Sequence, residues 1–136
     1  MSGKSLSSIT VKTTAVNHIV DITAQVADLV RAGAVKDGIC TVYVPHTTAA
    51  VTINENADPD VKSDLLLGLD RIVPDRLNYR HVEGNSPAHI KASMTGSSIT
   101  VIIDNGRLLL GTWQGIYFCE FDGPRTRTVY IKRVSG

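Results

Sequence analysis

The sequence lacks the features that mark several large classes of protein. No stretch approaches the roughly 18 consecutive apolar residues of a membrane span, and the polar start MSGKSLSSIT has no apolar segment of the kind found in signal peptides. We therefore expect a cytoplasmic protein with no membrane partner. The chain has 14 basic and 13 acidic residues, a net charge of +1, and no basic stripe that would follow a nucleic-acid backbone. No nucleic-acid partner is expected either.

Cysteines and nucleotide-binding motifs are equally scarce. Cys40 and Cys119 lie in separate apolar runs without CxxC spacing. This favours two small buried side chains over a redox pair or a zinc ribbon, while a single disulfide stays open. Neither GxGxxG nor GxxxxGK[ST] occurs, which disfavours a nucleotide-binding fold.

What the chain does contain is enough apolar sequence for one domain, residues 1–136, of which 43% are hydrophobic. Short β-branched runs separated by turn residues predict seven or eight mostly antiparallel strands. Three amphipathic segments predict helices: one begins at Asp21 or Thr23 and stops at Gly33, one begins at Asp58–Pro59 and runs to Gly68 or Arg71, and one is capped by Ser86 and ends at Gly96. Asn105–Gly106 predicts a type I′ hairpin. The fold class is therefore α+β.

The segment VPHTTAAVTIN, residues 44–54, combines strand-forming residues with a proline. Pro45 cannot donate a ladder hydrogen bond, so the strand must end, bulge or lie at an edge there. His46 then sits at a break in a strand, where a side chain can face a pocket or simply pack at a corner.

His46, His81 and His89 are the residues most suggestive of chemistry. If Ser86 caps a helix, His89 lies in its first turn, where the positive end of the helix dipole disfavours the imidazolium form. Neutral imidazoles bind metals, and three of them can hold Zn²⁺ with an open fourth position. Glu83 could orient a histidine or act as a general base. From the residues alone, three surface or capping histidines and an exposed turn glutamate explain the pattern as well.

A further cluster lies in GTWQGIYFCEFDGPRTR, residues 111–127. Trp113, the sole tryptophan, and Gln114 interrupt the apolar pattern and could face a flat ligand, although a single tryptophan is more often part of a core. Arg125, fixed by the preceding Gly–Pro, could bind a phosphate or carboxylate. Arg127 has the pattern of a solvent-exposed strand residue.

The segments VPHTTAAVTINENADP, HVEGNSPAHIKA and LLLGTWQGIYFCEFDGPR, taken together and in this order, resemble the YjbQ-like family, a group of small proteins described as secondary thiamine-phosphate synthases. The resemblance implies an α+β fold with a curved, mostly antiparallel sheet, helices on one side, and a homotrimer. It also implies a divalent metal ion, zinc by the preference of imidazole, held by His46, His81 and His89. Its remaining motif residues map onto Thr47, Thr48, Asn54, Glu55, Glu83, Asn85, Trp113, Gln114 and Arg125.

The activity implied by the resemblance joins hydroxymethylpyrimidine diphosphate to a thiazole phosphate and releases pyrophosphate, so the expected ligand is a small phosphorylated metabolite. Arg125 would stabilise the leaving diphosphate, and Glu83 would be the second catalytic residue. Magnesium, the usual partner of diphosphates, prefers oxygen ligands, whereas three imidazoles select zinc. Two alternatives therefore stand beside the synthase: a zinc-dependent hydrolase of a small phosphorylated or acyl metabolite, and a noncatalytic trimeric module that binds an anion or a metal.

Overall fold

The structure, a computed structural model, describes residues 5–136. Its elements follow in chain order: β1 (Leu6–Lys12), β2 (His18–Asp21), α1 (Thr23–Ala32), β3 (Gly38–Tyr43), β4 (Ala49–Glu55), α2 (Pro59–Ile72), α3 (Ser86–Thr95), β5 (Ser98–Asp104), β6 (Arg107–Leu108), β7 (Gln114–Glu120) and β8 (Thr126–Ser135). Every strand pairing is antiparallel. The predicted α+β class, with a curved and mostly antiparallel sheet and three helices, is confirmed.

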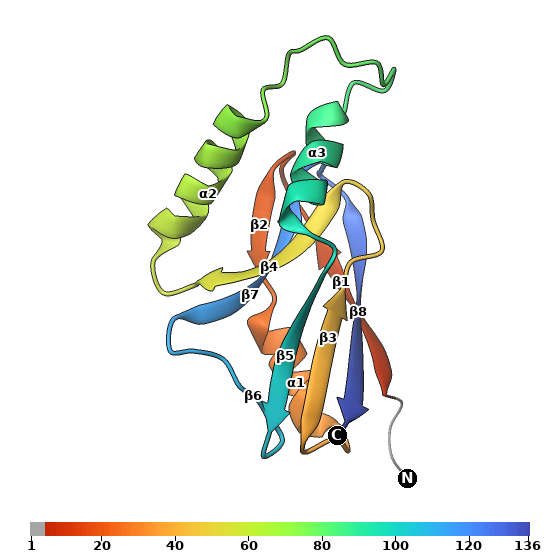
Figure 1. Ribbon diagram of the computed structural model, residues 1–136, viewed down its shortest axis with the longest axis vertical. Helices are drawn as coiled ribbons and strands as arrows, with labels where there is room; N and C mark the ends of the chain where they lie inside the picture. The colour runs from red at the N-terminus through yellow and green to blue at the C-terminus, as the bar shows by residue number, and fades with distance from the viewer. Residues whose placement is uncertain (1–4) are drawn as a thin grey trace.

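The strands form two sheets. Five strands pair in the order β1-β8-β3-β5-β6, and three pair in the order β2-β7-β4 (Figure 1). β8 joins the two ends of the chain into one ladder, because it pairs with β1 on one side and with β3 on the other. The two sheets therefore bring residues near 46, 120 and 127 to the same end of the molecule.

The main core lies between the inner face of the five-stranded sheet, the three-stranded sheet and α1. It is built from β-branched and aromatic side chains such as Val42, Val51, Phe118 and Ile131, all fully buried. A second cluster lies on the other face of the three-stranded sheet, where Ala88 and Ala92 of α3 pack on Tyr117 and Phe121. Helices α2 and α3 thus cover that sheet (Figure 1).

The helix boundaries follow the local sequence closely. Asp58 caps α2 by accepting a hydrogen bond from the backbone N–H of Asp60 at 2.9 Å, as its Asp–Pro start predicts. α3 differs from the prediction, because Asn85 rather than Ser86 occupies the cap position and its side chain makes no cap hydrogen bond. The amide of Asn85 is used elsewhere, in the site.

The predicted hairpin forms, with Asn105 and Gly106 both at positive φ, 51° and 76°. The strand expected after it is much shorter, because only Arg107–Leu108 pairs with β5.

Cys40 and Cys119 are both free and buried, as the sequence favoured. None of the helices in residues 5–136 is long and apolar enough to cross a membrane.

Candidate functional site

One pocket of about 380 Å³ collects polar residues from segments far apart in the sequence. Its lining consists of Pro45, His46, Thr47, Thr48, His81, Glu83, Asn85, His89, Asp122, Arg125 and Arg127. A neighbouring hollow of about 420 Å³ shares His46, Thr47 and His89 with it and continues along α3 toward Gly96. Both volumes are in the range that accommodates a small metabolite.

The strand break at Pro45 explains the position of His46. Tyr43 is the last residue of β3 to pair with β8, opposite Tyr130. Continued by two residues, the same register would place Pro45, which has no N–H, opposite Thr128. Instead, His46 Nε2 lies 3.0 Å from the Thr128 nitrogen, whose N–H donates to it, and 3.1 Å from the Thr128 carbonyl oxygen. The imidazole therefore replaces the missing strand partner.

This environment keeps His46 neutral. Burial lowers its pKa from the ordinary value, and the positive charge of Arg127 lowers it further, while the contact with Thr128 works in the opposite direction. Because Nε2 accepts from the Thr128 N–H, the proton of the neutral ring resides on Nδ1. His46 can then offer Nδ1–H as a hydrogen-bond donor.

The floor of the pocket is a buried ion pair between Arg127 and Glu120. Their side chains are 5% and 0% exposed. Arg127 donates Nε to Glu120 Oε1 at 2.8 Å, and its Nη2 donates to Glu120 Oε2 and, at 2.8 Å, to the Thr48 hydroxyl. Burial alone would raise the pKa of Glu120, but the hydrogen bonds from Arg127, the Asp122 N–H and Thr13 together hold it below the ordinary value.

The turn after Glu120 is packed tightly against the same floor. A Cβ on Gly123 would lie 2.3 Å from the Ala15 carbonyl oxygen and 2.8 Å from Glu120 Cγ. Glycine is therefore required there by space, and the turn that carries Arg125 is held firmly against the floor.

Arg125 forms one wall of the pocket and is half-exposed. Its Nε donates to the Asp122 carbonyl oxygen and its Nη2 to Asp122 Oδ2, both at 2.8 Å. Asp122 Oδ2 also accepts from Asn85 Nδ2 at 2.8 Å, which ties this wall to the start of α3. Asn85 Oδ1 is buried and has no partner within residues 5–136. One edge of the guanidinium is thus fixed, and the other is free to bind a ligand.

His81, Glu83 and His89 form the opposite rim. The rings of His81 and His89 meet edge to face, with centroids 5.1 Å apart and planes at 88°. Glu83 Oε1 lies 3.9 Å from His81 Nε2, which is too long for a hydrogen bond, and its side chain is 70% exposed. A small movement of this loop would bring the carboxylate into contact with the imidazole.

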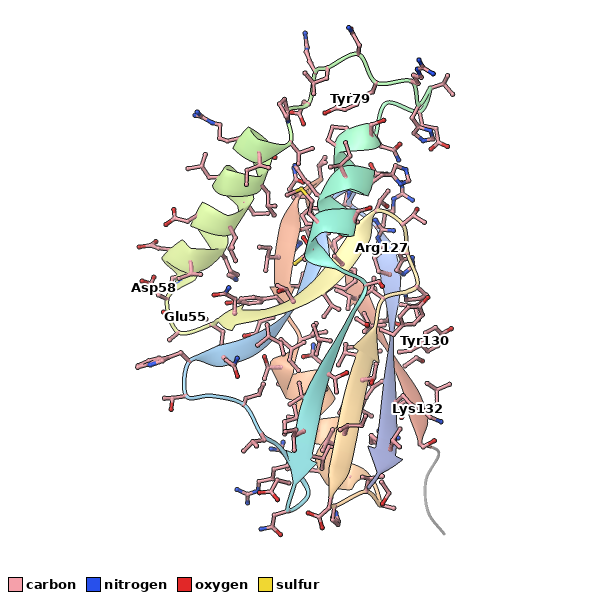
Figure 2. The ribbon with its side chains drawn as sticks, in the orientation of Figure 1. Glu55, Asp58, Tyr79, Arg127, Tyr130 and Lys132 are labelled. Atoms are coloured by element: carbon pink, nitrogen blue, oxygen red, sulfur yellow. The ribbon has the colours of Figure 1, made fainter. Side chains whose placement is uncertain are left out.

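The residues proposed from the sequence fall into two groups. The structure brings Thr47, Thr48, Asn85, Glu83, Arg125 and the three histidines to the pocket. Asn54, Glu55, Trp113 and Gln114 are not there, because the β4–β7 ladder pairs Ala49 with Glu120 at the pocket end and Glu55 with Gln114 at the far end. Figure 2 shows Glu55 and Arg127 at well-separated places. Whether these residues act in a site remains a prediction.

The expectation for Arg127 was wrong, and Glu120 was missed. Arg127 is 4% exposed and lies beneath the pocket instead of facing solvent. A signal for Glu120 was present: it is a carboxylate in the apolar run GIYFCEF, and a buried carboxylate needs a buried partner. Arg127, seven residues later and beyond a turn, is a basic residue within reach of that carboxylate.

The expected metal-binding function must also be corrected. No group of three or more histidine, cysteine or acidic side chains in the part of the chain that the structure describes is arranged to hold a metal ion. His46 explains part of this, since its Nε2 faces the backbone of Thr128. The three histidines share a pocket without converging on a point.

Comparison with known proteins places the chain among relatives. The family model described as UPF0047 protein YjbQ-like matches residues 7–136. The UPF0047 protein YugU of Bacillus subtilis is 54% identical over 128 residues, which are 93% of this chain and 97% of YugU. The UPF0047 protein MJ1081 of Methanocaldococcus jannaschii is 54% identical over 122 residues, 90% and 88% of the two chains.

Solved structures of similar proteins point to the same family. An uncharacterized conserved protein of the YjbQ/UPF0047 family from Clostridium acetobutylicum superposes with a TM-score of 0.92 at 55% identity, over 94% of this chain and 99% of that one. A YbjQ-like protein of unknown function from Sulfolobus solfataricus gives a TM-score of 0.93 at 31% identity, over 96% of each chain.

These relatives overturn the expected function. They are described as UPF0047 proteins, as uncharacterized or as of unknown function, so the resemblance brings no thiamine-phosphate synthase activity with it. The synthase assignment is therefore withdrawn together with the metal centre. What the match over residues 7–136 and the shared fold establish is that this chain belongs to the YjbQ-like UPF0047 family.

Proposed function

We propose that the histidine pocket is an enzymatic site that binds a small phosphorylated metabolite and transfers a proton to or from it. The observation that carries this proposal is that three imidazoles, the Glu83 carboxylate and the Arg125 guanidinium line one pocket of about 380 Å³. Proton transfer requires a general acid or base within reach of the ligand, such as an imidazole or a carboxylate, and binding of a phosphoryl group requires fixed donors. This pocket contains both.

Arg125 is the residue best suited to bind the phosphate. Its contacts with Asp122 leave Nη1 without a partner in the described chain, and its half-exposed side chain reaches the pocket. Thr47 lines the same pocket and adds a hydroxyl donor. Arg127 contributes positive charge from below while remaining paired with Glu120. Phosphate would thus meet a wall that is already oriented.

The proton carrier is the His81–Glu83 pair. Movement of Glu83 toward His81, which now lies 3.9 Å from it, would give His81 a carboxylate partner that fixes the orientation of the ring. His46, neutral and held by Thr128, is a donor through Nδ1 and not a proton carrier. In this proposal His46 therefore binds the ligand, and the His81–Glu83 pair transfers the proton.

Binding is tested by titrating inorganic phosphate and, separately, inorganic sulfate into the protein by isothermal calorimetry. Arg125→Ala removes charge-assisted hydrogen bonds and should weaken phosphate binding by about tenfold to a hundredfold. Arg31→Ala is the matched control, because Arg31 also pairs with an aspartate three residues earlier, Asp28, but lies outside the pocket. Unchanged affinity in Arg125→Ala would refute the binding role.

Turnover is tested with a set of small phosphorylated metabolites followed by ³¹P nuclear magnetic resonance, which detects any chemical change at or near the phosphorus. Conversion that is lost in His81→Gln while phosphate affinity is kept would support the proposal. Failure of every compound to change, with phosphate bound normally, would leave a binding protein and refute the enzymatic role. We also propose that the protein is cytoplasmic, as expected from the sequence.

A further inference from the structure

The hollow beside the histidine pocket has a lining of a different kind. Its volume is about 420 Å³, and it shares two histidines and a threonine with the pocket. The residues that line the hollow alone are Ala49, Ala92, Ser93, Gly96 and Ser97. No arginine, lysine or carboxylate side chain of residues 5–136 lines it. The two adjoining spaces therefore offer a ligand one charged end and one neutral end.

Small residues on a fixed backbone keep the hollow open. Ala49 of β4 and Ala92 of α3 are 1% and 8% exposed, so each offers only a methyl group. At the far end Gly96 has a positive φ of 107°, and a Cβ built on it would meet no atom within 4 Å. The Gly96 N–H donates to the Ala92 carbonyl oxygen at 2.9 Å, and the Gly96 carbonyl oxygen accepts from the Val51 N–H at 3.1 Å. The open space thus belongs to the fold.

Hydroxyl groups and imidazoles supply the polar contacts of the hollow. Thr47 and Ser97 are exposed, and each brings a hydroxyl that can both donate and accept. Ser93 Oγ donates to the His89 carbonyl oxygen at 2.9 Å, and its lone pairs can still accept. Neutral His46 adds its Nδ1–H as a donor. All of these groups suit uncharged polar partners.

This lining determines what the organic part of a ligand can be. A carboxylate or a second phosphate in the hollow would leave water without a cation beside it, which costs free energy. Apart from the two imidazoles, no aromatic side chain of the described chain lines the hollow, so a large flat ring has little to stack on. A carbon chain that carries hydroxyls can instead rest on the two alanines and pair its hydroxyls with the threonine and the serines.

We propose that the hollow binds the organic part of the phosphorylated ligand, and that this part is a neutral, hydroxylated chain. The ligand is then a phosphate monoester of a polyol or a sugar. Its phosphate lies at Arg125, and its chain runs past His46 and His89 along α3, toward the start of β5 (Figure 1). This inference rests on the proposed function, because it needs the phosphate in the histidine pocket.

Two probes of equal length test the class of ligand. Glycerol 3-phosphate and 3-phosphoglycerate both carry a phosphate on a three-carbon chain, but the second has a carboxylate in place of the terminal hydroxymethyl group. In calorimetric titrations we expect glycerol 3-phosphate to bind about tenfold more tightly than inorganic phosphate, and about tenfold more tightly than 3-phosphoglycerate. Tighter binding of 3-phosphoglycerate would overturn the inference.

Inorganic phosphate separates a failure of this inference from a failure of the proposed function. If inorganic phosphate binds, and glycerol 3-phosphate binds no more tightly, the hollow contributes nothing and the inference is overturned while the proposed phosphate site stands. If inorganic phosphate does not bind at all, the phosphate site itself is refuted, and the inference falls with it. These comparisons use the unsubstituted protein, so they do not depend on the folding of any variant.

A blocked hollow tests where the organic part lies. Ser93→Phe places a large ring on the side of α3 that lines the hollow, and side chains in a helix point back toward the preceding turn, here toward His89. The ratio of the affinities for glycerol 3-phosphate and inorganic phosphate should fall from about ten to about one. Met94→Phe is the matched control, because Met94 is the next residue of α3, is 53% exposed and lies outside the lining. An unchanged ratio in folded Ser93→Phe would overturn the inference.

A charge placed in the hollow should change the preference between the two probes. Ser93→Lys adds an ammonium group to the neutral lining and should raise the affinity for 3-phosphoglycerate, relative to glycerol 3-phosphate, by about tenfold. Met94→Lys adds the same charge one residue away, outside the lining, and should leave the preference unchanged. Circular dichroism checks that each variant is folded. An equal change of preference in the two lysine variants would overturn the placement of the chain in the hollow.

Discussion

The floor and the rim of the histidine pocket are built in opposite ways. The floor consists of Arg127, Glu120 and Thr48, all buried and joined by hydrogen bonds that leave little freedom. The rim consists of His89 in α3 and of the segment between α2 and α3, where His81 and Glu83 are exposed and Val82 between them is 97% exposed. Few contacts hold the rim, whereas the floor belongs to the sheet.

This difference indicates how the work of the site is divided. A preorganised floor fixes charge and orientation before a ligand arrives, and a weakly held rim can close over it afterward. We expect the floor residues to contribute most to the free energy of unfolding, and the rim residues to contribute most to turnover. Substitutions in the two regions should therefore separate the two properties.

The largest effect is expected from Glu120→Gln. The variant leaves Arg127 buried without its carboxylate, which costs about 3–5 kcal/mol for a broken buried ion pair. Urea unfolding followed by circular dichroism measures the change. Asp28→Asn is the comparison variant. It breaks the exposed Arg31–Asp28 ion pair, whose two residues are three positions apart on a helix, and should cost less than about 1 kcal/mol. Equal losses in the two variants would show that the floor is not the stabilising feature.

A smaller loss is expected from Lys91→Met, which loosens the contact between α3 and α2, the two helices that flank the rim segment. Lys91 of α3 is 2% exposed and donates Nζ to Asp70 of α2 and to Asn17 Oδ1. Hydrogen bonds to charged groups contribute about 1.5–3 kcal/mol, and because Asp70 is half-exposed we expect a loss near the lower value. Hydrogen exchange should rise in residues 73–85 and remain unchanged in β8. Faster exchange in β8 instead would show that Lys91 supports the floor and not the helices that flank the rim.

Much of this architecture could be predicted from local sequence. Asp58–Pro59 and Asn105–Gly106 determine a helix start and a turn through chemistry that acts within a few residues. Arg127 was misjudged because an alternating strand pattern does not reveal that the charged position faces a buried partner. Trp113 was grouped with the pocket because motif residues carry no information on the register of β4 and β7, which separates them.

His46→Ala should cost about 1 kcal/mol, since it removes the partner of the half-buried Thr128 N–H. The loss should depend on pH. The folded pKa of His46 lies below its ordinary value of 6.5, so at pH values just below 6.5 the unfolded chain binds more protons and the folded wild type loses stability as the pH falls. The difference between wild type and variant should therefore be smaller at pH 5.5 than at pH 7.5. An equal or larger difference at pH 5.5 would mean that His46 is not held neutral.

The smallest effect on stability belongs to Glu83→Gln at the rim. Its side chain is 70% exposed and makes no hydrogen bond in the described chain, so the free energy of unfolding should change by less than about 0.5 kcal/mol. Turnover of a phosphorylated substrate found by ³¹P resonance should nevertheless fall by about a hundredfold, because His81 loses the carboxylate that would orient it. Asp75→Asn, an exposed carboxylate in the same loop, serves as the control. If Glu83→Gln lowered stability and left turnover unchanged, the contrast between a structural floor and a reactive rim would be reversed, and the proton carrier would have to be sought at His89.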